Sequence, residues 1–141
     1  MSFIQKGITI EQLNKLSVNT LANSLGIEFV AIGDDFISAR MPVDHRTHQP
    51  LGMLHGGASV ALAETLGSLG AYCCLDNKIQ YCVGLEINAN HIKSIKEGFV
   101  VGTARAIHIG KKTQVWEIKI TNDQKELICI SRITMAVLDR K

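Results

Sequence analysis

The stretch Gly56–Leu75, GGASVALAETLGSLGAYCCL, decides the fold, because Glu64 is the only charged residue in its twenty positions. A segment of this length and composition is either a helix buried on all sides or a membrane span. An unpaired carboxylate is costly in both places, so Glu64 must be neutralised, hydrogen-bonded or used in chemistry. Two interpretations follow: a structural Glu satisfied by its neighbours, or a catalytic carboxylate whose basicity is tuned by apolar surroundings.

The composition of this stretch argues against a membrane span. It is rich in Gly and Ala, contains the central Glu64, and lacks flanking aromatic or basic belts. The N-terminus also lacks the basic-then-apolar pattern of a signal peptide. The cysteines have no zinc-ligand spacing and are expected to be small buried side chains in a reducing compartment: Cys73, Cys74, Cys82 and Cys129. We therefore expect a soluble cytoplasmic protein without a metal site.

The whole chain has the length and composition of one globular domain, residues 1–141. Hydrophobic residues make up 46% and charged residues 20% of the sequence, which is ordinary for a folded protein. The formal net charge of +2 is spread along the chain and does not indicate a nucleic-acid surface.

The residues before the long apolar stretch predict a helical lead-in (1–25) and then a hairpin. Thr9–Gln12 has the spacing of a capping box, and the apolar residues after it predict one helix, or two short ones, ending near Gly26. Two β-rich runs, 27–32 and 36–41, flank a turn-like sequence. The polar segment that follows, 42–54, is predicted to be a loop, where functional residues are common.

The residues after the apolar stretch predict four strands, of which the last three form a meander. One antiparallel sheet wrapped around the central helix explains both the number of strands and the absence of a polar helix face, an α+β architecture. A single sheet leaves its helix partly uncovered and its edge strands unpaired, so we expect a closed homodimer. The predicted strands are 82–93, 100–109, 114–121 and 126–138.

The helix start and Glu64 are candidates for one reaction. The unpaired N–H groups at Gly56 and Gly57, with the positive end of the helix dipole, favour a developing oxyanion. Ser68 lies one turn beyond Glu64 and can hydrogen-bond its carboxylate or a nearby water. Because Gly56 and Glu64 are about 12 Å apart along the axis, the two groups are predicted to come from different subunits, giving two composite sites per dimer.

Structural roles are possible for each of these residues. The sole role of Gly56 and Gly57 could be to let the helix pack closely against its neighbours. The Ser68 hydroxyl could bond back to the backbone carbonyl of Glu64. His91, which ends a predicted strand, could serve hydrogen bonding alone.

Two motifs carry a resemblance to a known family. His48–Ala58 (HQPLGMLHGGA), with Ala63-Glu64 and Gly67-Ser68 behind it, resembles the hotdog-fold acyl-CoA thioesterases. Val83–His91 (VGLEINANH) resembles the branch, of the phenylacetic-acid-degradation type, that hydrolyses aromatic acyl-CoA thioesters. Members of that branch act on 1,4-dihydroxy-2-naphthoyl-CoA in menaquinone or phylloquinone synthesis, on hydroxybenzoyl-CoA, or on aryl groups misloaded onto carrier proteins. The similarity runs from about residue 25 to 138.

The resemblance implies catalytic roles for five residues. Glu64 matches the carboxylate that acts as nucleophile or general base. Gln49 and the Gly56 N–H match the groups that polarise the thioester carbonyl, and His55 supports the same site. Ser68 falls where the family has a Ser or Thr that helps to place the hydrolytic water.

The resemblance also implies substrate contacts and an assembly. His91 matches a histidine of the acyl pocket, and Gly57 stands beside the oxyanion donor. The turn Gly110, Lys111 and Lys112 falls where related enzymes contact the nucleotide phosphates of coenzyme A. A homotetramer built from two dimers is implied as well, and no cofactor beyond the coenzyme A of the substrate.

Hydrolysis of an acyl-CoA thioester suits this residue set, because a thiolate leaving group needs no strong general acid. The acyl group could be aromatic or of medium chain length. Two alternatives remain open from the sequence: a hotdog-fold hydratase or dehydratase acting on an acyl thioester, and a non-catalytic acyl-CoA-binding protein.

Overall fold

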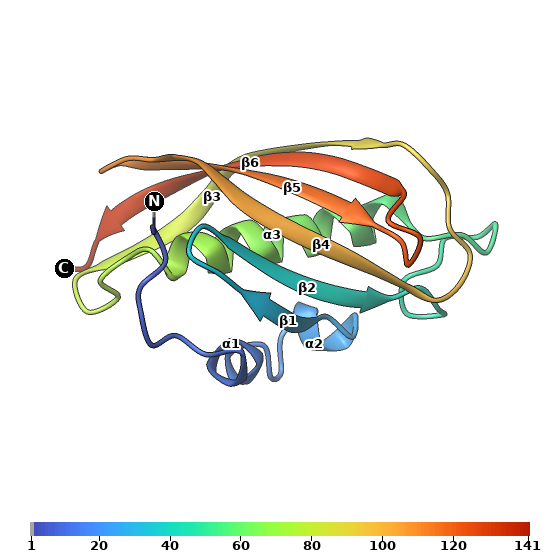
Figure 1. Cartoon of the computed structure of the whole chain (residues 1–141), viewed down its shortest axis with the longest axis horizontal. Helices are drawn as coiled ribbons and strands as arrows, with labels where there is room; N and C mark the ends of the chain where they lie inside the picture. The colour runs from blue at the N-terminus through green and yellow to red at the C-terminus, as the bar shows by residue number, and fades with distance from the viewer. Residues whose placement is uncertain (1) are drawn as a thin grey trace.

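A single long helix, α3 (Gly56–Tyr72), lies along the concave face of one curved antiparallel sheet (Figure 1). The structure, a computed structural model, describes residues 2–141. The sheet has the strand order β1-β2-β4-β5-β6-β3, so that β1 and β3 are its edges. The strands are β1 (Glu28–Ile32), β2 (Phe36–Pro42), β3 (Gln80–His91), β4 (Phe99–Ile109), β5 (Thr113–Thr121) and β6 (Leu127–Asp139).

The predicted architecture is confirmed: an α+β fold with an antiparallel sheet wrapped around the helix. β1 and β2 form the expected hairpin, and β4, β5 and β6 form the expected meander. The remaining strand, β3, follows α3 in the chain and pairs with β6 at the far edge of the sheet. This crossover places the helix against the inner face of the sheet.

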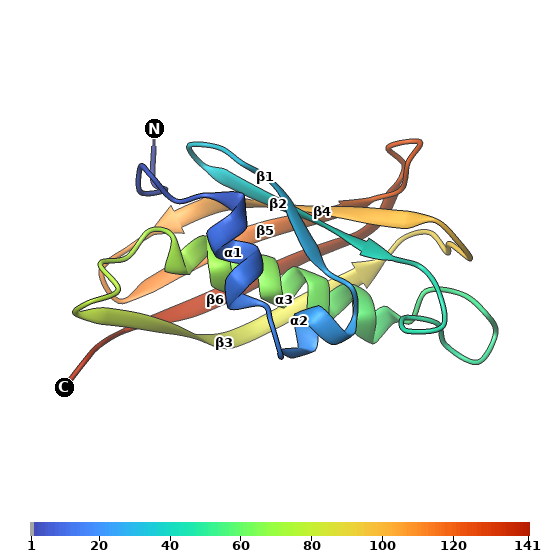
Figure 2. The ribbon, with the colours of Figure 1, turned by 90° about the horizontal axis from the view of Figure 1, so that it is seen from below.

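The helical lead-in is two short helices, α1 (Ile10–Leu16) and α2 (Leu21–Ser24). The capping box predicted at the start of α1 is present, because the Gln12 N–H donates to the Thr9 hydroxyl and the Thr9 N–H donates to the Gln12 side chain. Figures 1 and 2 show both helices on the side of α3 that faces away from the sheet.

One face of α3 is packed against the sheet and the other is not. Leu62, Ala63 and Leu66 are fully buried, and Gly67 permits close approach, since a Cβ there would lie 2.4 Å from Ile133. Glu64, on the opposite face, is exposed in the single chain. As we expected for a single sheet, the sheet of one protomer covers only one side of the helix, so α3 is not buried on all sides within one protomer.

The edge strand β3 exposes apolar side chains together with its unpaired backbone edge. Val83 is 43% exposed and Leu85 is 61% exposed. Such an edge favours pairing with another strand, and this one is long and apolar. Within residues 2–141, no helix has the length and apolar character needed to cross a membrane.

Candidate active site

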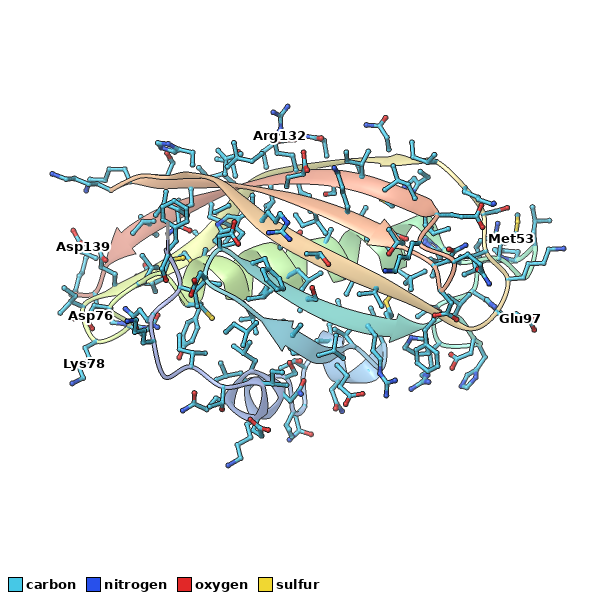
Figure 3. The ribbon with its side chains drawn as sticks, in the orientation of Figure 1. Met53, Asp76, Lys78, Glu97, Arg132 and Asp139 are labelled. Carbon is cyan, nitrogen blue, oxygen red and sulfur yellow. The ribbon has the colours of Figure 1, made fainter. Side chains whose placement is uncertain are left out.

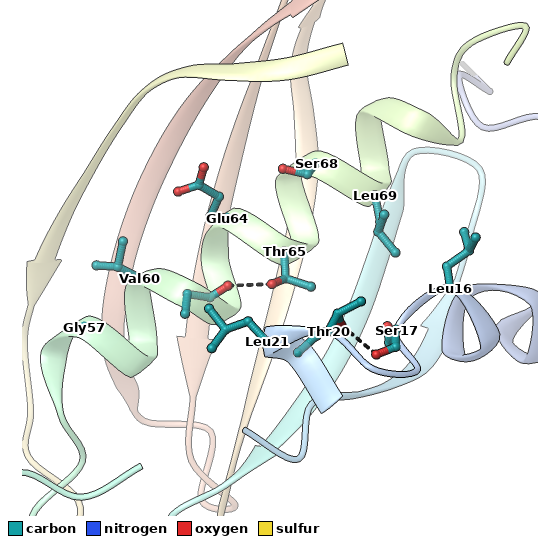
Figure 4. Close-up of a pocket in the computed structure, with 12 residues that line it drawn as sticks. Leu16, Ser17, Thr20, Leu21, Gly57, Val60, Glu64, Thr65, Ser68 and Leu69 are labelled. Atoms are coloured by element: carbon teal, nitrogen blue, oxygen red, sulfur yellow. Dashed lines mark hydrogen bonds between the residues drawn. The ribbon is translucent and has the colours of Figure 1, made fainter. Parts of the chain in front are cut away.

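Glu64 lies on the uncovered face of α3 and lines a cavity of about 520 Å³. Figure 4 shows Glu64 and Ser68 on one side of the helix, while Leu16 and Leu21 of the lead-in approach the neighbouring side. Among the described residues that line this cavity, Glu64 is the only one with a charged side chain. The cavity therefore presents one carboxylate in mainly apolar surroundings.

The carboxylate of Glu64 reaches across to the edge strand β3. A Cβ built on Gly84 would lie 3.0 Å from Oε1 of Glu64, so the absence of a side chain at residue 84 makes room for the carboxylate. The register of β3 against β6 shifts between Gly84 and Glu86, as in a β-bulge. Gly84 is a site residue that we did not predict; its only sequence signal is its place in the GLEINANH motif.

Ser68 lines the same cavity with its hydroxyl largely free. Among residues 2–141, the only hydrogen bond found for this hydroxyl is a weak one of 4.0 Å to the sulfur of Met135. Neither the expected bond to the Glu64 carboxylate nor the alternative bond to the Glu64 carbonyl is found in the described chain. Thr65, in contrast, donates its hydroxyl to the Ala61 carbonyl at 2.7 Å. Ser68 is thus able to bind a water beside Glu64.

The start of α3 keeps one backbone donor available. The Gly57 N–H donates to Nδ1 of His55 at 2.7 Å, which makes His55 the N-cap of the helix. No protein acceptor for the Gly56 N–H is found in the part of the chain that the structure describes. The His91 ring lies against Gly56, since a Cβ there would be 2.8 Å from its Nε2. The Gly56 N–H is therefore the group that could stabilise an oxyanion.

Gln49 shares a second cavity, of about 340 Å³, with Gly56 and His91. The side-chain oxygen of Gln49 accepts a hydrogen bond from the Leu51 N–H. This bond fixes which end of the amide is the acceptor, and it leaves the amide NH₂ free to donate. Gln49 and Gly56 therefore bring two donors to one cavity.

The loop before α3 is held in one conformation by its own polar groups. The Thr47 hydroxyl, which is buried, donates to the Pro42 carbonyl at 2.7 Å. The Arg46 guanidinium donates to the Asp44 carboxylate at 2.7 Å and keeps the pKa of that carboxyl well below its usual range. These contacts position the segment that carries Gln49.

The predicted catalytic residues Glu64 and Gln49 do not converge within one chain, although Gly57 lies in the same cavity as Glu64. Glu64 and Ser68 line one cavity, and Gln49, Gly56 and His91 line another. The turn with Gly110, Lys111 and Lys112 lines a third cavity, which also includes Asp139. Figure 3 shows Asp139 at one end of the molecule and Met53, from the Gln49 cavity, at the opposite end.

Replacing His55 tests the helix cap. We expect His55→Ala to lower the free energy of unfolding by about 0.5–2 kcal/mol, because the Gly57 N–H loses its acceptor. Urea denaturation at a fixed protein concentration measures the change. His55→Asn, which supplies a side-chain oxygen as the acceptor in place of Nδ1, should recover most of the loss. His45→Ala is the matched control, since that side chain is 90% exposed. Equal free energies of unfolding for His55→Ala and His45→Ala would show that His55 does not stabilise the helix as a cap.

One cavity of the protomer thus holds the Glu64 carboxylate and the Ser68 hydroxyl. The other cavity holds two N–H donors, the Gly56 backbone and the Gln49 amide. A carboxylate can attack a carbonyl carbon or activate water, and paired donors can stabilise the resulting oxyanion. Within residues 2–141, no three His, Cys, Asp or Glu side chains gather in a way that could hold a metal ion.

Comparisons with known proteins show which family has this fold. Residues 51–129 match the model of the thioesterase superfamily. The structure of a mutant of thioesterase PA1618 from Pseudomonas aeruginosa has 49% sequence identity and a TM-score of 0.97, and the match covers 99% of this chain and 100% of that one. Thioesterase HI1161 from Haemophilus influenzae has 48% identity and a TM-score of 0.94, with 97% and 95% covered.

A curated relative adds an activity. The 1,4-dihydroxy-2-naphthoyl-CoA hydrolase of Escherichia coli K12 is 48% identical over 134 residues, which are 95% of this chain and 98% of that protein. The segment that matches the family model, residues 51–129, includes α3, β3, β4, β5 and the start of β6. On this evidence the chain is a hotdog-fold hydrolase that belongs to the thioesterase superfamily.

Proposed function

We propose that the protein hydrolyses the thioester of an aromatic acyl-CoA and that Glu64 is the catalytic carboxylate. The observation that carries the proposal is the position of Glu64, as the one charged side chain of a cavity of about 520 Å³ with mainly apolar walls. The relative that hydrolyses 1,4-dihydroxy-2-naphthoyl-CoA supports the aromatic acyl group and suggests a place in menaquinone synthesis.

Two routes use the same residues. Glu64 either attacks the thioester carbonyl, giving a mixed anhydride that water then opens, or it takes a proton from a water that attacks the carbonyl. In both routes the oxyanion is held by the Gly56 N–H and the Gln49 amide, and the CoA thiolate leaves. One water is consumed, and the products are the free acid and CoA. Ser68 binds the attacking water.

The proposal includes a homodimer, because one protomer keeps its carboxylate and its oxyanion donors apart. Pairing of β3 with a second β3 would satisfy the unpaired edge and cover Val83 and Leu85. A two-fold axis reverses the second protomer and so brings the Gly56 end of its helix toward the Glu64 face of the first. Each site would then combine Glu64 of one protomer with Gln49 of the other.

The Gly110, Lys111 and Lys112 turn is proposed to bind the phosphates of the CoA nucleotide. Both lysines are exposed, and they share a cavity with Asp139, which lies at the end of the molecule opposite to Met53 of the Gln49 cavity. A reversed partner would bring this turn close to the Gln49 end of the other subunit. The homotetramer implied by the family resemblance stays a prediction.

A thiol-release assay tests the proposed function. The substrates are benzoyl-CoA, 1-naphthoyl-CoA and butyryl-CoA, and CoA is detected with a thiol-reactive dye. Burial raises the pKa of all four thiols, to about 12 for Cys73 and about 11 for Cys74, so the thiols of the protein contribute little signal. We expect faster hydrolysis of the aromatic esters. An absence of CoA release from every ester would overturn the proposal.

Adding a side chain at Gly84 should displace the catalytic carboxylate. A Cβ at this position comes within 3.0 Å of Oε1 of Glu64, so Gly84→Ala should lower kcat modestly. Gly84→Val, which is bulkier, should lower kcat by about tenfold to a hundredfold, because small misplacements of a reacting group are costly. Gel filtration checks that the oligomeric state is retained. A kcat that does not decrease from Gly to Ala to Val would show that this contact has no role.

A further inference from the structure

The wall of the Glu64 cavity is supplied partly by the N-terminal lead-in. The α3 side contributes Glu64, Ser68 and Leu69. The facing side is formed by five residues of the lead-in: Leu16, Ser17, Thr20, Leu21 and Ala22. Figure 4 shows Leu21 beside the first half of α3 and Leu16 near its second half. These leucines lie outside residues 51–129, the segment that matches the family model. The family model thus contains Glu64 and Ser68 but not this wall, whereas relatives matched over nearly the whole chain, such as thioesterase PA1618, extend over the lead-in as well.

This wall offers no free hydroxyl donor. The Ser17 hydroxyl donates to the Leu13 carbonyl at 3.3 Å, and the Thr20 hydroxyl donates to the Ser17 carbonyl at 2.6 Å. What remains facing the cavity is mainly the side chains of Leu16, 48% exposed, and Leu21, 65% exposed. Two exposed leucines beside a carboxylate form a surface that an apolar group of a ligand would cover.

The lead-in is fixed firmly enough to act as a wall. Leu13 is fully buried in the core. The Asn14 amide both donates to the Phe29 carbonyl at 3.2 Å and accepts from the Phe29 N–H at 2.8 Å, which ties α1 to the edge strand β1. The corner between α1 and α2 is set by Asn19, whose φ of 60° lies in the left-handed region. The two leucines are therefore held at defined positions.

We propose that Leu16 and Leu21 determine the size of the acyl group that the enzyme accepts, and that they pack against the ring system of an aromatic acyl-CoA. This inference rests on the proposed function, because it needs the thioester carbonyl beside Glu64. A cavity of about 520 Å³ is within the range of small-molecule sites. From the carbonyl, the acyl group extends between α3 and the lead-in, where it covers both leucines.

The experiment uses separate variants to narrow and to widen the cavity. Leu16→Trp and Leu21→Trp narrow the cavity, and Leu16→Ala and Leu21→Ala widen it. Val18→Trp is the matched control, because Val18 lies in the same segment, is 58% exposed and does not line this cavity. For each variant, kcat/KM is measured for 1-naphthoyl-CoA and for butyryl-CoA, and circular dichroism verifies folding.

The measured quantity is the ratio of kcat/KM for the naphthoyl ester to that for the butyryl ester. Changes of one or a few methylene groups in an apolar pocket alter such ratios by about 10- to 200-fold. We therefore expect the Trp variants at 16 and 21 to lower the ratio at least tenfold relative to Val18→Trp. In the Ala variants we expect the ratio to shift by at least threefold. Ratios in all four variants that stay within twofold of the control, or that change equally in the control, would overturn the inference.

The Glu64→Ala variant, assayed with the same two esters, separates this inference from the proposed function. If Glu64→Ala hydrolyses both esters at the wild-type rate, the catalytic role of Glu64 in the proposed function fails, whatever the wall variants do. If Glu64→Ala is inactive and the wall variants leave the ratio unchanged, only the role of Leu16 and Leu21 fails.

Discussion

Glu64→Ala is expected to lose thioester hydrolysis almost completely while keeping its fold. General acid–base groups contribute about 10²- to 10⁴-fold to rate, and a nucleophile contributes at least as much, so kcat should fall by that factor or more. Glu64→Gln preserves the shape but cannot attack a carbonyl or accept a proton from water, and it should be equally impaired. CoA release under saturating substrate measures both variants.

The loss can be attributed to chemistry because Glu64 contributes little to the fold of a protomer. Its carboxylate is exposed, and no hydrogen bond or ion pair to it is found in residues 2–141. Urea midpoints of wild type and Glu64→Ala should therefore agree closely. Glu97→Ala, another exposed carboxylate away from the cavity, is the control and should keep full activity. Rates near wild type in Glu64→Ala would refute the assignment.

Most of the fold could be predicted from local patterns. The capping box at Thr9 and Gln12 locates α1, and the alternation and turns after β3 predict the meander of β4, β5 and β6. These signals come from residues that are close in sequence. The local hydrogen bonds that such residues form recur in most folds, so the patterns can be recognised without the tertiary structure. The lone charge in an apolar helix also singled out Glu64, which the structure places in a cavity.

The surroundings of Glu64 could not be predicted in the same way. The sequence of α3 is apolar all round, which indicates burial but does not say whether the same chain or a second chain supplies the cover. In one protomer that face is open, and the lead-in covers only part of it. The contact with Gly84 depends on how β3 returns beside α3, a long-range relation that a local pattern does not contain.

Mixing two inactive variants should restore activity if each site is shared between protomers. Gln49→Ala removes an oxyanion donor and should lower kcat by about 10²- to 10³-fold. In a mixed dimer of Glu64→Ala and Gln49→Ala, one site carries both substitutions and the other carries neither. After refolding of an equal mixture, half of the dimers are mixed and one of their two sites is intact. About a quarter of the wild-type activity should therefore return.

The control distinguishes true complementation from a change in folding. Glu64→Ala mixed with the double variant Glu64→Ala/Gln49→Ala cannot form an intact site in any arrangement, so it should remain inactive after the same refolding. If the Glu64→Ala and Gln49→Ala mixture never exceeds the sum of its two components, each protomer holds a complete site of its own. Gln49 and Glu64 line separate cavities in one protomer, so such a result would require the loop at residues 42–54 to move toward Glu64. Recovery to about a quarter instead places the oxyanion donors and the carboxylate on opposite sides of a two-fold interface.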